Sequence, residues 1–315
     1  MAGITLIVLG GLLVAVPAAV AVALLRWSGR HAPDGAPLRR ARRHDALIAW
    51  ASTVAGLVTA AGVLTLPITW TTDRLPAPPA AGVLWTVGPF AVAVAACLVR
   101  AVGELTWPRP AGTVRTASLT RRTVRDLGSV PLRALGATAA LLATALVAAG
   151  VTAGPSGTSV ASPERTLADG SIVSGSAGPY PGWPYGVPML AALAVTLVVT
   201  IATLRVVARR APLTDLSSEQ DDAVRRTSAA RTVAAVQVCV GGATALTLVV
   251  TGGALRRAGT ARIGDVVDRV AAMTVTGYLA TALAVAIAAV TVAVVVRAAR
   301  GVPVAPVRVG ARADG

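Results

Sequence analysis

The side chains in this sequence that could bind a metal lie close together in one short basic segment. His31, Asp34, His44 and Asp45 are residue types that ligate zinc, and a zinc site needs three or four such ligands in close contact. Six arginines occupy residues 26–43 of the same segment. We therefore interpret the four residues as part of a solvated basic loop, and we predict no metal site.

The familiar arrangements for catalysis and cofactor binding are missing from the sequence. An intramembrane serine protease or a transmembrane haem site needs histidine inside the bundle, whereas His31 and His44 both precede the second apolar run. Asp34-Gly35 followed by arginines is similar to part of a lipid head-group transferase motif, but the further aspartates of that motif are absent. There is no P-loop, and no lysine to hold a retinal Schiff base. We expect no enzymatic activity and no cofactor.

Four polar side chains within the apolar part of the sequence are candidates for contact with a solute. They are Gln237, Tyr278, Thr244 and Thr274. A permease needs polar groups of this kind along its path, but threonine hydroxyls in helices commonly bond to carbonyls of their own helix. The sequence leaves both interpretations open.

Seven long apolar runs must position these side chains. Hydrophobic residues make up 55% of the chain and charged residues 14%, and the mean hydropathy is +0.70, all typical of a membrane protein. A run of about 20 apolar residues crosses the hydrocarbon core as a helix. No run contains an acidic residue, lysine or histidine, so the usual marks of an ion path are absent. The predicted spans are 4–25, 46–69, 81–102, 134–154, 187–207, 231–251 and 271–296.

The predicted fold is an all-α, polytopic transmembrane bundle in one membrane domain, residues 1–300, followed by a short disordered tail at 301–315. Its orientation follows from the arginines, which provide all 29 basic residues and leave a net charge of +15. Short loops rich in arginine stay in the cytoplasm. Most arginines fall on that side if the N-terminus lies outside and the C-terminus lies in the cytoplasm. We predict this orientation in the cell membrane.

The loop at 103–133 is a candidate contact with lipid. Arg115, Arg121, Arg122 and Arg125 lie in it. Each arginine beside a membrane is attracted to anionic headgroups by about 1 kcal/mol. We predict contact with lipid headgroups here, and a specific protein partner is the alternative.

The segment at 211–231 is predicted to form a helix continuous with the sixth span. Ser218 and Asp221 resemble a capping box. Asp221–Arg225 and Asp222–Arg226 are acid–base pairs spaced to meet on one helix face. We interpret the segment as a solvated helix extension, and the alternative is a docking helix for a cytoplasmic partner.

Two external loops have weaker patterns. Residues 155–188 begin with a Ser/Gly-rich composition typical of disorder. They end with Trp183 and Tyr185, which we interpret as anchors in the outer interface. Between the last two spans, Asp265 and Asp268 are predicted to lie at a helix start, where carboxylates suit the helix dipole.

Three stretches together resemble a known group of sequences. They are GELTWPRPAGTVRTASLTRRTVRD at 103–126, GPYPGWPYGVPML at 178–190 and DDAVRRTSAARTVAAVQV at 221–238. These resemble recurring segments of uncharacterised multi-pass integral membrane proteins from high-GC actinobacteria. The resemblance implies a location in the cell membrane and no particular activity.

The sequence leaves two classes of function. The first is a structural or interaction subunit of a membrane assembly, which requires a tightly packed bundle and a membrane protein partner. The alternative is a permease, or a permease subunit, for an apolar or weakly polar solute, which requires a cavity. The prediction is the interaction subunit, with the permease as its alternative, and no contact with nucleic acid in either case.

Overall fold

The computed structural model describes residues 36–70, 79–107, 123–166, 169–213, 216–263 and 266–300. The first predicted span, 4–25, lies outside these residues, as does the predicted tail at 301–315. The other six predicted spans fall within them.

Long helices form most of the described structure. Six of them, within the described ranges, are long and apolar enough to cross a membrane. The prediction of a multi-pass, all-helical membrane domain is therefore confirmed for the second to seventh spans. The helices are α2 (Ala36–Trp70), α3 (Pro79–Leu105), α4 (Ser129–Thr152), α5 (Trp183–Arg209), α6 (Ser218–Gly259) and α7 (Ala271–Arg300).

Several helices continue well past the predicted spans. α6 has 42 residues, so it is about 63 Å long, roughly twice the thickness of the hydrocarbon core. The predicted span 231–251 covers only its middle. The difference arises because hydropathy marks where a helix is apolar, whereas alanine and arginine continue a helix into polar surroundings without penalty.

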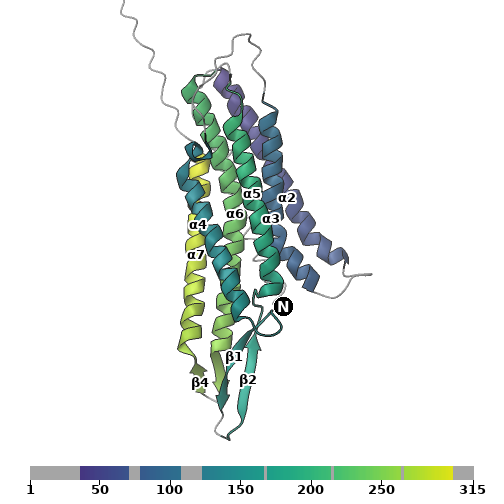
Figure 1. Ribbon diagram of the computed structural model, residues 1–315, viewed down its shortest axis with the longest axis vertical. Coiled ribbons are helices and arrows are strands. Elements are labelled where there is room, and N and C mark those ends of the chain that lie inside the picture. The colour runs from purple at the N-terminus through teal and green to yellow at the C-terminus, as the bar shows by residue number, and fades with distance from the viewer. Residues whose placement is uncertain are drawn as a thin grey trace, which may run out of the picture.

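Consecutive helices run in opposite directions along the long axis of the bundle (Figure 1). The starts of α2, α4 and α6 lie at one end with the ends of α3, α5 and α7, and we call this the charged end. α6 is the central helix, because it packs against each of the other five. Its most apolar stretch is 67% buried, against 17–39% in the others.

Two antiparallel hairpins lie at the opposite end of the bundle, which we call the hairpin end (Figure 1). β1 (Val160–Thr166) pairs with β2 (Ile172–Ala177). The disorder expected for the first half of loop 155–188 is therefore wrong. The turn explains why a Ser/Gly-rich segment can order: the Asp169 carboxylate accepts hydrogen bonds from Ser171, and Gly170 adopts a positive φ of 81°.

The second hairpin replaces a predicted helix start. β3 (Thr260–Ile263) pairs with β4 (Val266–Arg269), so Asp268 lies on a strand and not in a first helical turn. The Asp268 carboxylate forms an ion pair with Arg165 of β1, whose Nε atom lies 2.6 Å from Oδ2. Asp265 lies outside the described residues. The two hairpins are thus joined by an ion pair between strands that are far apart in the sequence.

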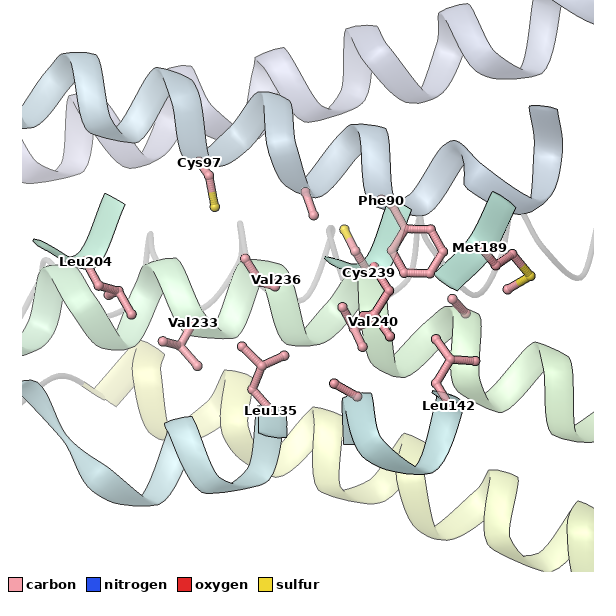
Figure 2. Close-up of a cluster of buried hydrophobic side chains, with 14 of the residues drawn as sticks. Phe90, Cys97, Leu135, Leu142, Met189, Leu204, Val233, Val236, Cys239 and Val240 are labelled. Carbon is pink, nitrogen blue, oxygen red and sulfur yellow. The ribbon is translucent and has the colours of Figure 1, made fainter. Parts of the chain in front are cut away.

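The apolar core lies between α3, α4, α5 and α6. Figure 2 shows Phe90 and Cys97 of α3 on one side of α6, and Leu135 and Leu142 of α4 on the other. On the outer face of the bundle, Val151 and Val285 are 73% and 67% exposed. A bundle that is apolar inside and outside is suited to a lipid environment.

Small residues allow some helices to approach each other closely. A Cβ atom on Gly252 of α6 would lie 2.5 Å from the backbone oxygen of Gly277 on α7. A Cβ atom on Gly150 of α4 would likewise lie 2.6 Å from the indole of Trp183 at the start of α5. Close approach of backbones is how helices gain packing energy in lipid, where apolar desolvation provides no driving force.

Candidate functional site

Charged side chains are buried inside the bundle at its charged end. The first is Asp45 of α2, which is only 3% exposed. Its carboxylate accepts hydrogen bonds from Arg100 of α3 and Arg231 of α6, one on each oxygen. Asp45 is therefore shared between two arginines from two other helices.

Arg100 and Glu104 lie one helical turn apart on α3, and they extend this group of buried charged residues. The Arg100 guanidinium lies 3.3 Å from the Glu104 carboxylate and donates to the Ser228 hydroxyl of α6 at 2.6 Å. The Ser228 hydroxyl in turn donates a hydrogen bond to the Glu104 Oε1 atom. Glu104 is 2% exposed, so its charge depends on these partners.

Arg210, directly after α5, joins Glu104 to the next carboxylate. Its guanidinium lies 3.4 Å from Glu104 and 3.2 Å from Asp221 of α6. It also lies over the Trp107 ring, 4.2 Å from the centroid, and the Trp107 indole donates to Glu104 at 3.0 Å. Burial lowers the pKa of Arg210, and the charge of Glu104 opposes this effect only in part.

Arg225 forms the far end of the set. It is 1% exposed and lies 2.8 Å from Asp221, one turn before it on α6. Its Nη1 atom donates to the carbonyls of Val207 and Ala208, at 3.3 and 3.2 Å. These are among the last carbonyls of α5, which have no partner within their own helix. Arg225 therefore closes the C-terminal end of α5.

The ion pairs form one continuous, alternating series, which we call the charge network. Each of its three carboxylates lies between two arginines, so the series has an arginine at both ends. In order, it runs Arg231, Asp45, Arg100, Glu104, Arg210, Asp221 and Arg225. It joins α2, α3, the end of α5 and α6 at the charged end of the bundle.

This arrangement corrects two interpretations made from the sequence. Asp45 does not belong to a solvated basic loop, because it lies within α2 and is buried. The Asp221–Arg225 pair is not on a solvated helix face either, since both residues are 1% exposed. In both cases the neighbouring helices supply partners that the local sequence does not contain.

The start of α6 differs from the predicted one by a single residue. Ser217 is the cap: its hydroxyl accepts from the Gln220 backbone at 3.3 Å, and the Gln220 side chain accepts from the Ser217 backbone at 3.2 Å. The predicted pair was Ser218 and Asp221. Gln220 at the third position completes the usual capping box, which leaves the Asp221 carboxylate available for the charge network.

An apolar pocket lies directly beside the Arg231 end of the charge network. It is lined by some of the residues within 49–60 of α2, 92–100 of α3, 231–239 of α6 and 295–299 of α7. Most of these side chains are small, and Cys97 and Cys239 are among them. Leu57, also in the lining, is 48% exposed, so the pocket opens at the surface of the bundle.

The pocket is large enough for an organic molecule. Its volume is about 150 Å³. An apolar cavity of about this volume can bind a molecule the size of benzene. The volume is below the roughly 300–1,000 Å³ of typical ligand pockets.

Gln237 and Tyr278 both lie away from the pocket lining. Gln237 is fully buried, and its amide donates to Thr138 of α4 at 3.0 Å and to Thr291 of α7 at 3.2 Å. It therefore bridges three helices. Tyr278 is 60% exposed on α7, and Arg256 lies over its ring at 5.0 Å from the centroid.

The other predicted site residues either bond within their own helix or lie in a short helix or outside the described residues. Thr244 and Thr274 donate to the carbonyls four residues before them, at 2.7 and 3.1 Å. Arg125 lies in a short 3-10 helix, Val124–Leu127. The remaining three predicted headgroup contacts, Arg115, Arg121 and Arg122, lie outside the described residues.

The sequence contained a partial signal for the charge network. Arg100–Glu104 and Asp221–Arg225 are both pairs at i, i+4. Only the second was singled out, and neither spacing distinguishes a buried pair from a solvated one. No sequence pattern links Asp45 to Arg231, because they meet only when the helices assemble.

Searches of protein-family models, of curated proteins and of solved structures find no match to this chain. Nor do the described residues contain a group of three or more His, Cys, Asp or Glu side chains placed to hold a metal ion. The geometry is suited to non-covalent binding in the apolar pocket, which has arginine side chains at one end.

Proposed function

We propose that this membrane protein holds an apolar or weakly polar solute in the pocket between α2, α3, α6 and α7, and that it acts as a permease or permease subunit. The observation that carries the proposal is the pocket itself, which is open at the bundle surface and lined mainly by small apolar side chains. A bundle that served only as a packed structural subunit would have no need of such a space.

The position of the opening suits a solute that arrives from the lipid. Leu57 lies in the middle of the span predicted at 46–69, and it is 48% exposed. An apolar molecule concentrated in the hydrocarbon region would reach the pocket without crossing polar headgroups. The charge network would then close the path toward the charged end, because four chain segments are held together there by ion pairs.

We also propose that the charged end faces the cytoplasm. Exposed arginines surround this end on every long helix except α3: Arg39, Arg40, Arg42, Arg43, Arg133, Arg205, Arg209, Arg226, Arg297 and Arg300. An excess of arginine favours the cytoplasmic side, and anionic headgroups would add to the attraction. This orientation agrees with the external N-terminus predicted before the first span at 4–25, and we propose the cytoplasmic membrane as the location.

An interaction subunit is the second candidate, favoured by the hairpin end. Ile172 and Val173 of β2 are 67% and 49% exposed. Two-stranded sheets have open edges, and exposed apolar residues on them are suited to pairing with a partner. If this function holds, native mass spectrometry of the gently extracted protein will show a second protein at fixed stoichiometry.

The experiment that tests pocket binding uses dodecanol as a neutral, apolar probe. The protein is held in phosphatidylcholine nanodiscs, and bound dodecanol is counted by native mass spectrometry. Ala96→Leu adds bulk to the pocket lining on α3, whereas Ala91→Leu adds the same bulk to an exposed position of the same helix. We expect Ala96→Leu to abolish saturable binding and Ala91→Leu to leave it unchanged.

Two results would overturn the proposal. One is the absence of saturable dodecanol binding to the native protein. The other is equal binding by both leucine variants, which would place the probe on the lipid-facing surface and not in the pocket.

A further inference from the structure

We infer that the solute is an anionic amphiphile, with a carboxylate or phosphate head at Arg231 and an apolar chain along the pocket. This inference rests on the proposed binding in the pocket, and it changes the solute from a neutral molecule to one whose apolar chain carries a charged head. It is carried by the charge balance of the network, by the position of its last arginine, and by the shape of the space beside it.

The charge network has one more cation than anions. Its three buried arginines, Arg100, Arg210 and Arg225, are matched by three buried carboxylates. Arg231 is the additional cation, and its side chain is 17% exposed. A positive charge that is largely removed from water is unfavourable unless an anion compensates it.

The two ends of the series differ in how they are compensated. Arg225, at one end, donates to the two carbonyls at the end of α5, where the helix dipole is negative. Arg231, at the other end, shares Asp45 with Arg100. Among the described residues, every arginine of the network has one buried guanidinium nitrogen without a hydrogen-bond acceptor, so this feature does not distinguish the two ends. The end beside the pocket is therefore the one without helix-terminal carbonyls to compensate its charge.

Arg100 and Arg231 are the two charged residues of the pocket lining, and both belong to its end nearest the network. From there the lining continues along α2 from Ala49 to Ala60, a distance of roughly 16 Å at the helical rise. The space is therefore elongated, with positive charge at one end and apolar walls along the rest. An anionic head joined to a single apolar chain matches both parts.

The test compares two probes with the same chain and different heads. Dodecanoate and dodecanol are titrated against the protein in phosphatidylcholine nanodiscs, with bound probe counted by native mass spectrometry. One charge-assisted contact predicts roughly tenfold tighter binding of dodecanoate. Acetate provides the carboxylate without the chain, so it separates an amphiphile site from a site for free anions.

The variants test whether the anionic head group binds at Arg231. Arg231→Gln should remove the preference for dodecanoate over dodecanol, and Asp45 keeps Arg100 as its partner in this variant. Arg231→Lys retains the charge and should retain the preference. Arg226→Gln, an exposed change on the same helix, is the matched control and should leave the preference intact.

The outcomes separate this inference from the proposed function. Equal binding of dodecanol and dodecanoate, blocked in Ala96→Leu, overturns the anionic head and leaves pocket binding in place. Competition by acetate at the same site overturns the amphiphile. A preference for dodecanoate that survives in Arg231→Gln also overturns the inference, and saturable binding of neither probe overturns both proposals.

Discussion

Asp45 of α2 and Arg231 of α6 are 186 positions apart in the chain, and they form an ion pair beside the apolar pocket. α2 otherwise packs mainly along α3. The pair therefore fixes the position of α2 relative to the central helix at the charged end. It also holds Arg231 at the margin of the pocket, which connects the stability of the bundle to the geometry of the candidate site.

Removing the charge of Asp45 should destabilise the protein strongly. Asp45→Asn leaves Arg100 and Arg231 buried without their shared carboxylate, and loss of one partner from a buried ion pair costs about 3–5 kcal/mol. Thermal unfolding in detergent measures the effect as a lower Tm. Glu219→Gln, an exposed acid in the first turn of α6, is the control and should cost about 1 kcal/mol or less.

A double variant distinguishes lost pairing from general damage. Arg231→Gln added to Asp45→Asn removes one of the two stranded cations, so the combined loss should be smaller than the sum of the separate losses, by about 0.5–3 kcal/mol. Strict additivity of the two Tm changes would contradict a direct interaction between these side chains.

Gln237→Leu should have only a small effect on stability and none on the pocket. The amide donates to Thr138 and Thr291, but its buried Oε1 atom has no hydrogen-bond partner among the residues that the structure describes. Hydrogen bonds between membrane helices average about 0.6 kcal/mol and reach about 1.7. We expect the free energy of unfolding to fall by an amount within that range, which is measured as a lower Tm. Dodecanol binding should be unchanged, because Gln237 is not in the pocket lining.

Thr138→Val tests the same hydrogen bond from α4. Its Tm loss should not add to that of Gln237→Leu, since each change removes the bond that the other removes. Reduced dodecanol binding in Gln237→Leu would instead show that the solute reaches this residue.

Two glycines of α6 provide a matched test of helix packing. A Cβ atom at Gly252 would lie 2.5 Å from the Gly277 oxygen, whereas one at Gly242 would meet nothing within 4 Å. Gly252→Ala should destabilise the protein by about 1–3 kcal/mol through overpacking. Gly242→Ala should be neutral or stabilise it by up to about 1 kcal/mol, because alanine favours helix. Equal Tm values for the two variants would contradict the close contact of α6 with α7.

The sequence predicts the membrane-spanning helices of the described region well, because each apolar run is long enough to specify its own element. It does not predict the charge network. Glu104 and Arg210 lie just beyond the apolar runs, where charged residues are normally solvated, and their burial depends on helices that the local sequence does not include. The pocket is invisible for the same reason: small residues such as Ala96 can mark either a close helix contact or a space.

The hairpins show a related limit. β1 carries Pro163 and Glu164, and β2 carries Gly175 among serines, so neither segment has the alternating apolar pattern of a strand. Their order comes from backbone pairing and from the Arg165–Asp268 ion pair between the two hairpins. Neither contribution can be read from composition.

The proposed orientation predicts which residues can be labelled from outside the cell. Ser176 on β2 and Ser218 at the start of α6 are both exposed, at opposite ends of the bundle. Cysteine is placed at each in turn, after Cys97 and Cys239, both buried, are changed to alanine. A membrane-impermeant maleimide should label Ser176→Cys in intact cells and Ser218→Cys only after permeabilisation, because the exposed arginines hold the charged end in the cytoplasm. Labelling in the reverse order would place the charged end outside, and it would remove anionic cytoplasmic headgroups as the counter-charge for those arginines.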